Sequence, residues 1–163
     1  MKQVSTSFLK LVVMLIGVPA FVLGVFTLPK IALKAIEEVQ NGGELGYIVL
    51  LTLLIMYISA VPFYLALFQT IKLLGYIDSN QAFSDLSVVA LKKIKNSSKI
   101  ISCLYLLALP FAYMIAEWDD APGLIVIGLV IMGSSLVVAV FASVLQRLLE
   151  EAINIKSEND LTV

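Results

Sequence analysis

The sequence contains no histidine and a single cysteine, Cys103. The lack of histidine excludes imidazole acid–base catalysis and histidine metal sites, and one cysteine cannot form an intrachain disulfide. Cys103 lies in an apolar run, where a thiol is inert and acts as a packing residue. No nucleophile–base pair, metal-ligand set or phosphate-binding loop can be assembled either, so we expect a non-enzymatic protein with no cofactor.

Charge is also scarce. Charged residues make up 14% of the chain and hydrophobic residues 60%, whereas soluble domains carry about 25% charged residues. Four windows have no charged residue at all, and they hold 19, 27, 17 and 26 residues. A helix needs about 20 apolar residues to cross a hydrocarbon core of about 30 Å. We therefore expect an all-α membrane protein with spans at about 9–29, 46–71, 100–117 and 122–146.

The apolar windows favour helices over barrel strands. In lipid, every backbone amide and carbonyl must be paired within the protein, and these windows are continuously apolar instead of alternating as barrel strands do. The first window is longer than the apolar core of a signal peptide, which holds about 7–15 residues. The sequence thus predicts one integral membrane domain over residues 1–163, a four-transmembrane-helix bundle.

Lysine and arginine are distributed unevenly between the two sides of such a bundle. The N-terminus, the second connection (residues 72–99) and the tail (147–163) share one side, which holds nine of the 11 basic residues. The other side holds Lys30 and Lys34. The positive-inside rule then places both termini in the cytoplasm, and we expect a multi-pass protein of the bacterial plasma membrane. The net charge of −1 gives no indication of direct nucleic-acid binding.

Both long connections carry helix signals. In the first, Pro29 suits the first turn of a helix that Asn41–Gly43 would stop, either on the outer surface or as an extension of the first span. In the second, Ser84 suits the N-cap of a helix with Asp85 in its first turn. That helix is amphipathic and lysine-rich. It suits an anionic membrane surface or a partner, or it continues the third span.

No acidic or basic side chain interrupts the spans, which argues against ion-coupled transport, because transporters carry such residues within the membrane. Tyr57 and Tyr64 lie seven residues apart, on one helix face, and are expected to pack or hydrogen-bond between helices. Small residues repeat every four positions in the third and fourth spans, which permits close helix approach and is compatible with a homo-oligomer. They are Ala108, Ala112, Ala116, Ser135, Ala139 and Ser143.

The third connection is short and acidic. Glu117, Asp119 and Asp120 could bring three carboxylates to one calcium ion or engage a cationic peptide outside the cell. These residues are therefore a candidate outer-loop signal site. The alternative is a solvated turn before the fourth span, since the sequence shows no further ligands.

The tail extends the fourth span beyond Arg147 and becomes polar before its last apolar pair, Leu161 and Val163. A tail that ends in this way suits docking into a partner's groove or adding a strand to a partner's sheet. A frayed terminus is the alternative.

Four segments give the chain a resemblance to a known family. They are Tyr76–Ser84, Ser87–Lys95, Asp119–Gly123 and Ile155–Val163. The chain resembles the small bacterial four-helix membrane proteins grouped as domain of unknown function 2975. The family has no assigned activity, and its members tend to be encoded beside a small helix-turn-helix regulator of the Cro/CI type. The resemblance implies a membrane partner that holds or releases a transcription factor.

The leading hypothesis is a regulatory or sensory membrane protein that binds a cytoplasmic protein, such as a small helix-turn-helix regulator. Candidate partner-binding residues are Asp78, Phe83, Ser84, Ser87, Lys92, Lys93, Lys95, Lys156, Glu158, Asn159, Asp160, Leu161 and Val163. The alternative is a small transporter, a permease subunit or an immunity factor against membrane-active peptides. In that case a cavity would be lined by Tyr57, Pro62, Tyr64, Pro110, Ser134 and Ser135.

Overall fold

The computed structural model describes residues 2–162, with side chains from Ser5 onward. Its elements are all helical: α1 (Lys2–Val22), the π-helix η1 (Leu23–Thr27), α2 (Leu28–Gln40), α3 (Leu45–Asp78), α4 (Asp85–Trp118) and α5 (Gly123–Leu161). Since α1, η1 and α2 form one continuous rod, the described residues contain four helices long and apolar enough to cross a membrane. This confirms the all-α, four-span prediction.

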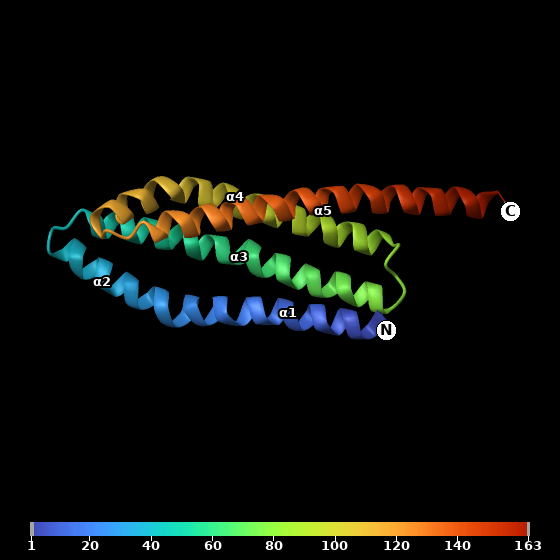
Figure 1. Cartoon of the computed structure of the whole chain (residues 1–163), viewed down its shortest axis with the longest axis horizontal. Coiled ribbons are helices and arrows are strands. Elements are labelled where there is room, and N and C mark those ends of the chain that lie inside the picture. The colour runs from blue at the N-terminus through green and yellow to red at the C-terminus, as the bar shows by residue number, and fades with distance from the viewer. Residues whose placement is uncertain (1, 163) are drawn as a thin grey trace.

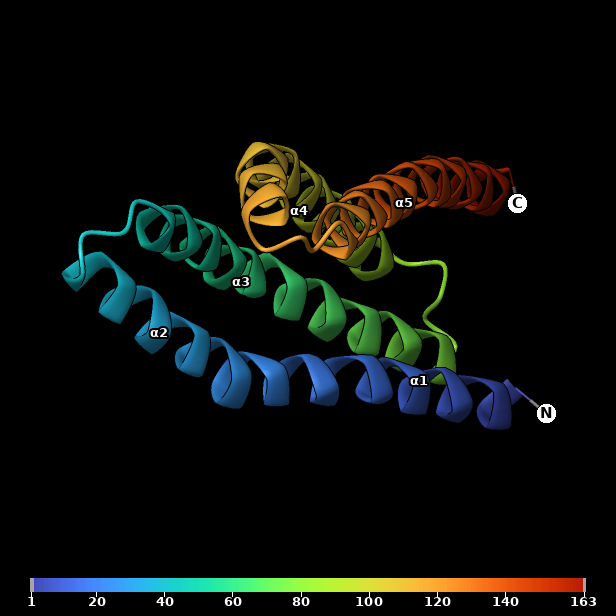
Figure 2. The ribbon, with the colours of Figure 1, turned by 60° about the vertical axis from the view of Figure 1, so that its left-hand side comes forward.

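The four rods pack in chain order. Extensive contacts join α1 and α2 to α3, α3 to α4, and α4 to α5, and Figures 1 and 2 show the resulting row of antiparallel helices. The bundle is therefore open, because the rod α1–α2 and the helix α5 form its two flanks. Both chain ends and the α3–α4 turn lie at one end of the molecule (Figure 1).

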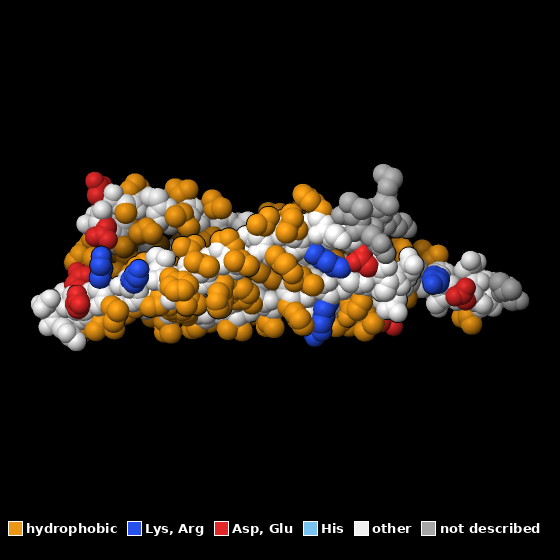
Figure 3. All heavy atoms as spheres, turned by 90° about the horizontal axis from the view of Figure 1, so that it is seen from below, with side chains coloured by type: hydrophobic (Ala, Val, Ile, Leu, Met, Phe, Trp, Pro, Cys, Tyr) orange, Lys and Arg blue, Asp and Glu red, His pale blue; other side chains and the backbone are white. Residues whose placement is uncertain are grey.

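The flanking helices leave most of their apolar surface uncovered. Only 11% of the apolar window of the α1–α2 rod and 6% of that of α5 are buried. The total accessible surface is 10902 Å², against about 8,000 Å² for a globular monomer of this mass. On the face in Figure 3, hydrophobic side chains cover the middle and charged ones gather toward the ends. That distribution is what a hydrocarbon slab requires.

The turns between the long helices share one design. Each contains a residue with positive φ: Gly42 at 84°, Asn80 at 58° and Asp120 at 51°. In each turn the next amide donates to the carbonyl five residues earlier, at 2.9, 2.8 and 3.0 Å respectively, which is the Schellman arrangement. The predicted helix stop at Asn41–Gly43 is confirmed.

Pro29 shapes the join between α1 and α2. The Leu28 amide donates to Leu23 O, one carbonyl earlier than in an α-helix. In that π register the partner of Gly24 O would be the nitrogen of Pro29, which carries no hydrogen. The Tyr57 hydroxyl of α3 donates to Gly24 O at 3.0 Å instead, so a side chain from the next helix satisfies a carbonyl that would otherwise be unpaired in lipid.

A second tyrosine-to-glycine hydrogen bond of this kind lies seven residues further along α3. The Tyr64 hydroxyl donates to Gly17 O of α1 at 3.1 Å, and Gly17 leaves little room, since an added Cβ would lie 3.1 Å from Leu67 Cδ1. The predicted interhelical role of Tyr57 and Tyr64 is thus confirmed. The tyrosine spacing on α3 matches the glycine spacing on α1 and η1, which sets the register of these antiparallel helices.

The α4–α5 interface is formed by small residues. Ala139 and Ala142 of α5 are 2% and 4% exposed, and the Ser102 hydroxyl of α4 donates to Met132 O of α5 at 3.2 Å. Ala139 belongs to the predicted small-residue series of α5. It packs within the chain and is therefore not available to a second subunit.

The residues proposed to line a transport cavity do not lie together around one space. Tyr57 and Tyr64 engage α1 and η1, Pro110 lies exposed on α4, and exposed Ser134 donates within its own helix to Val130 O. Pro62 is buried in α3. These side chains face different neighbours, so they do not share one cavity.

Candidate functional site

Most of the candidate residues lie at the end of the molecule that holds both termini and the turn at residues 79–84, which we call the basic end. The predicted connection over residues 72–99 is largely helical there, because α3 continues to Asp78 and α4 begins at Asp85. The amphipathic lysine-rich segment is thus a direct continuation of the third span. Residues 79–84 alone form the link.

Asp78 joins α3 to α1. Its carboxylate accepts a hydrogen bond from Lys10 Nζ, with an N–O distance of 2.5 Å, and another from the Thr6 hydroxyl. A carboxylate at a helix C-terminus is unfavourable beside the negative end of the helix dipole, and Lys10 offsets that charge. The hydrogen bond from Lys10, then that from Thr6, lowers the pKa of Asp78 below its ordinary value. Asp78 therefore holds two helices together instead of standing free for a partner.

Lowering the pH should loosen this contact. Because the pKa of Asp78 is lowered in the folded protein, the ion pair stabilises the fold above the ordinary carboxylate range and loses that effect as the pH falls through the lowered pKa. We expect Asp78→Asn to reduce thermal stability slightly at neutral pH and to reduce it less at pH 3. Asp160→Asn, on the exposed tail, is the matched control. Equal effects of Asp78→Asn at both pH values would contradict the role of the ion pair.

The turn at residues 79–84 is held by serine hydroxyls. Ser84 and Ser87 both donate to Gln81 O, at 2.7 and 3.2 Å. Ser84 does occupy the predicted N-cap position, but its side chain makes no capping hydrogen bond. Ser87 is fully buried, so it cannot be touched by a partner. Phe83 is 65% exposed beside these residues and is the apolar contact that this turn offers.

The lysines of α4 divide into two kinds. Lys92 and Lys93 are exposed, and neither forms an ion pair with a described residue. Lys95 donates to Gln146 Oε1 of α5 at 2.7 Å, and Gln146 Nε2 donates in turn to Glu150 Oε1 at 2.9 Å. This chain of hydrogen bonds fixes α5 against α4 near the basic end.

The last part of α5 projects alone (Figure 1). The helix holds 39 residues and ends at Leu161, which corresponds to a length of about 58 Å, and its last part extends past every other element (Figure 1). From Leu148 onward it carries four acidic residues and one lysine, Lys156. Ile155 and Leu161 are 68% and 84% exposed. Val163 lies outside the described residues.

The structure therefore brings only part of the candidate surface together. Phe83, Lys92 and Lys93 lie on the body of the bundle, whereas the tail residues are carried away from it on α5. The projecting tail residues are Lys156, Glu158, Asn159, Asp160 and Leu161.

The acidic turn lies at the opposite end of the molecule. Glu117 is the penultimate residue of α4, and Asp119 and Asp120 directly follow the end of that helix. The positive φ of Asp120 makes it part of the helix stop. Among the described residues, no three acidic or sulfur-bearing side chains are placed to hold a metal ion, so the calcium hypothesis finds no ligand cluster here.

Sequence reasoning missed several contacts at the basic end. Lys10 and Thr6 meet Asp78 across 68 and 72 residues of sequence, and Gln146 links Lys95 to Glu150. No local pattern marks these pairs. The one available signal was position, since Lys10 and Gln146 lie at the ends of charge-free windows.

Comparison with known proteins identifies the family of this chain. Residues 3–163 match the family described as "Protein of unknown function (DUF2975)". The chain belongs to the DUF2975 family. A relative from Bacillus subtilis (strain 168), described as "Uncharacterized membrane protein YoaS", is 54% identical over 163 residues and covers 100% of both chains. No solved structure matches the chain. The resemblance predicted from sequence is confirmed, and the protein is a membrane protein with four candidate spans.

Proposed function

We propose that this protein is a non-enzymatic regulatory component of the bacterial plasma membrane that binds a cytoplasmic protein through the projecting part of α5. The observation that supports the proposal is a helix that continues well beyond the membrane-sized bundle, with carboxylates and exposed apolar side chains and no neighbouring helix. A short helical segment without neighbours is marginal in water, so a binding partner would stabilise the projecting part of α5.

The shape of the tail favours one mode of recognition. Because α5 is helical through Leu161, docking of the helix in a partner's groove is favoured over strand addition. Ile155 and Leu161 would supply apolar contacts. Glu150, Glu151, Glu158 and Asp160 call for a basic partner surface, and a DNA-binding regulator of the helix-turn-helix class carries such a surface.

Orientation follows from the charges. The basic end carries nine of the 11 lysines and arginines, so the positive-inside rule puts it in the cytoplasm. The tail would then reach soluble cytoplasmic proteins, while Glu117, Asp119 and Asp120 would face outward, where they would meet an envelope signal.

Charge reversal in the tail should abolish capture of the partner. The full chain is purified in detergent together with a small Cro/CI-type regulator, the proposed class of partner. The variant Glu158→Lys/Asp160→Lys should retain at least about tenfold less regulator than the unsubstituted chain, because repulsive charges replace attractive ones in the interface. The matched control, Glu117→Lys/Asp119→Lys, makes the same charge change at the far end and should retain the regulator fully.

Two results would count against the proposal. Equal recovery of the regulator by the tail variant and the control would show that the tail is not the binding element. Absence of the regulator from every purification would show that it is not the partner.

A further inference from the structure

A groove on the surface of α4 and α5 is unlike the rest of the apolar exterior. It has a volume of about 360 Å³ and is lined by Lys99 of α4 and by α5 residues from Leu136 to Leu148. Lys99 and Arg147 are the first charged residues at the basic ends of the third and fourth charge-free windows. The groove thus begins at the edge of the apolar band and continues into it.

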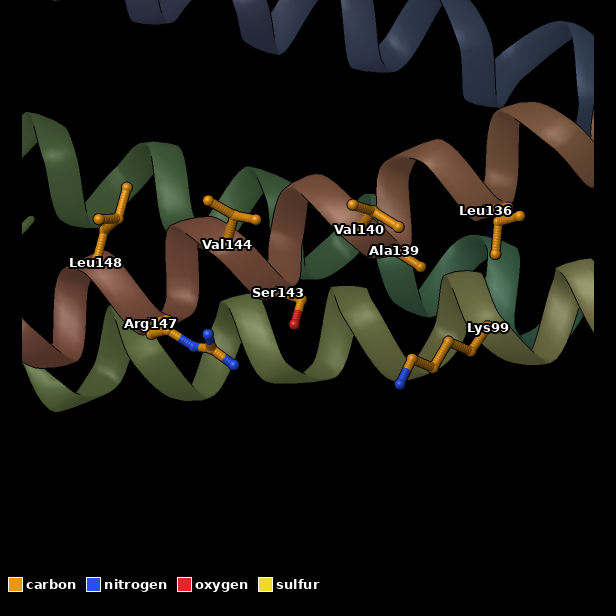
Figure 4. A pocket seen from close by; sticks show the side chains of 8 residues that line it. All are labelled: Lys99, Leu136, Ala139, Val140, Ser143, Val144, Arg147 and Leu148. Atoms are coloured by element: carbon orange, nitrogen blue, oxygen red, sulfur yellow. The ribbon is translucent and has the colours of Figure 1, made fainter.

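Two cations line this groove. Lys99 and Arg147 come from different helices and point toward each other, with the Ser143 side chain between them on the same side of α5 (Figure 4). Among the described residues no carboxylate lies within ion-pair distance of either cation. Lys10 and Lys95 at the same end do have partners, Asp78 and Gln146. The groove therefore presents two unpaired positive charges and a hydroxyl donor.

An apolar wall on α5 runs alongside the two cations, from Leu148 beside Arg147 to Leu136 beside Lys99 (Figure 4). It is formed by every fourth residue of α5: Leu136, Val140, Val144 and Leu148 (Figure 4). From Arg147 to Leu136 the helix rises about 16 Å, close to half of the roughly 30 Å hydrocarbon thickness. The wall is thus about as long as one lipid leaflet is deep.

We propose that this groove binds an anionic phospholipid, with the phosphate between Lys99 and Arg147 and one acyl chain along the wall of α5. A phosphate is the group that paired cations and a hydroxyl recognise, and basic pockets between transmembrane helices on the cytoplasmic side bind anionic headgroups. Inorganic phosphate does not account for the wall, since it has no apolar surface to place against Val140 and Val144. This proposal does not depend on the tail or its partner.

Binding of phosphatidylglycerol to the full chain tests the proposal, measured by native mass spectrometry in detergent with phosphatidylcholine as the zwitterionic comparison. We expect Lys99→Gln/Arg147→Gln to weaken phosphatidylglycerol binding by about tenfold or more, the effect expected from two basic side chains at an anionic headgroup. Lys92→Gln/Lys93→Gln removes the same charge from the same end but outside the groove, and should change binding by less than about twofold.

A second variant tests the acyl-chain part. Val140→Trp fills the wall at a residue that is 56% exposed, so it should leave the fold intact, as circular dichroism and elution volume will show, while weakening lipid binding with both cations present. Excess inorganic phosphate should not displace the lipid. The proposal is overturned if the two double variants bind phosphatidylglycerol alike, if phosphatidylcholine binds equally well, or if phosphate displaces the lipid.

Discussion

Gly46→Ala is expected to lower the free energy of unfolding by about 1–3 kcal/mol, as overpacking of a close interface does. Gly46 is buried where α3 begins, against α2. A Cβ at this position would lie 2.5 Å from Ala35 O, 2.6 Å from Val39 Cγ2 and 3.0 Å from Val39 N. Two of these three atoms belong to the backbone, so a side-chain rotation cannot relieve the clash. The rod α1–α2 would have to move away from α3.

Displacement at Gly46 should spread along the rod. The rod is held against α3 by the hydrogen bonds from Tyr57 and Tyr64 and by the Lys10–Asp78 ion pair, and it has no other extensive neighbour. A shift of α2 therefore strains contacts on η1 and α1 as well. Equilibrium unfolding in mixed detergent micelles measures the loss of stability.

Gly75→Ala is the matched control in the same helix. A Cβ at Gly75 meets nothing within 4 Å, so this substitution should raise stability by up to about 1 kcal/mol through reduced chain entropy. Equal effects of the two substitutions would contradict the close packing of α2 on α3.

The spans and turns were predictable because their causes are local. Missing charges marked the four membrane-sized helices, and Gly42 marked the end of α2 because its positive φ suits glycine. The spacing of Tyr57 and Tyr64 placed both on one face. Their glycine partners were not predictable, because Gly17 and Gly24 lie in a different helix and the π register that frees Gly24 O depends on Pro29.

The basic end was harder to predict. The lysines of residues 92–99 suggested either a surface helix or a continuation of the third span, and the structure shows the continuation, since α4 runs through them without interruption. A helix that leaves the hydrocarbon meets water and accepts charges, so a change in composition marks the membrane boundary and not the end of the helix. Ser87 is a second example: its polarity suggested an exposed residue, but the Schellman turn before it provides an acceptor for its hydroxyl, Gln81 O.

The two proposed sites lie at the same end of the molecule. Both the projecting part of α5 and the Lys99–Arg147 groove lie at the basic end, and binding of a cytoplasmic protein requires that end to face the cytoplasm. A cytoplasmic protein cannot reach the tail otherwise. The excess of lysine and arginine at this end supports the cytoplasmic orientation. This orientation is the central claim about the protein.

Cysteine accessibility in intact cells tests that claim most directly. In a Cys103→Ser background, which removes the single native cysteine, Ser157→Cys marks the tail and Asp119→Cys marks the far end; both positions are exposed. A membrane-impermeant maleimide should label Asp119→Cys almost completely in intact cells. It should leave Ser157→Cys almost unlabelled in intact cells and label it only after permeabilisation. Labelling of Ser157→Cys in intact cells, with protection of Asp119→Cys, would contradict the orientation and with it the cytoplasmic tail.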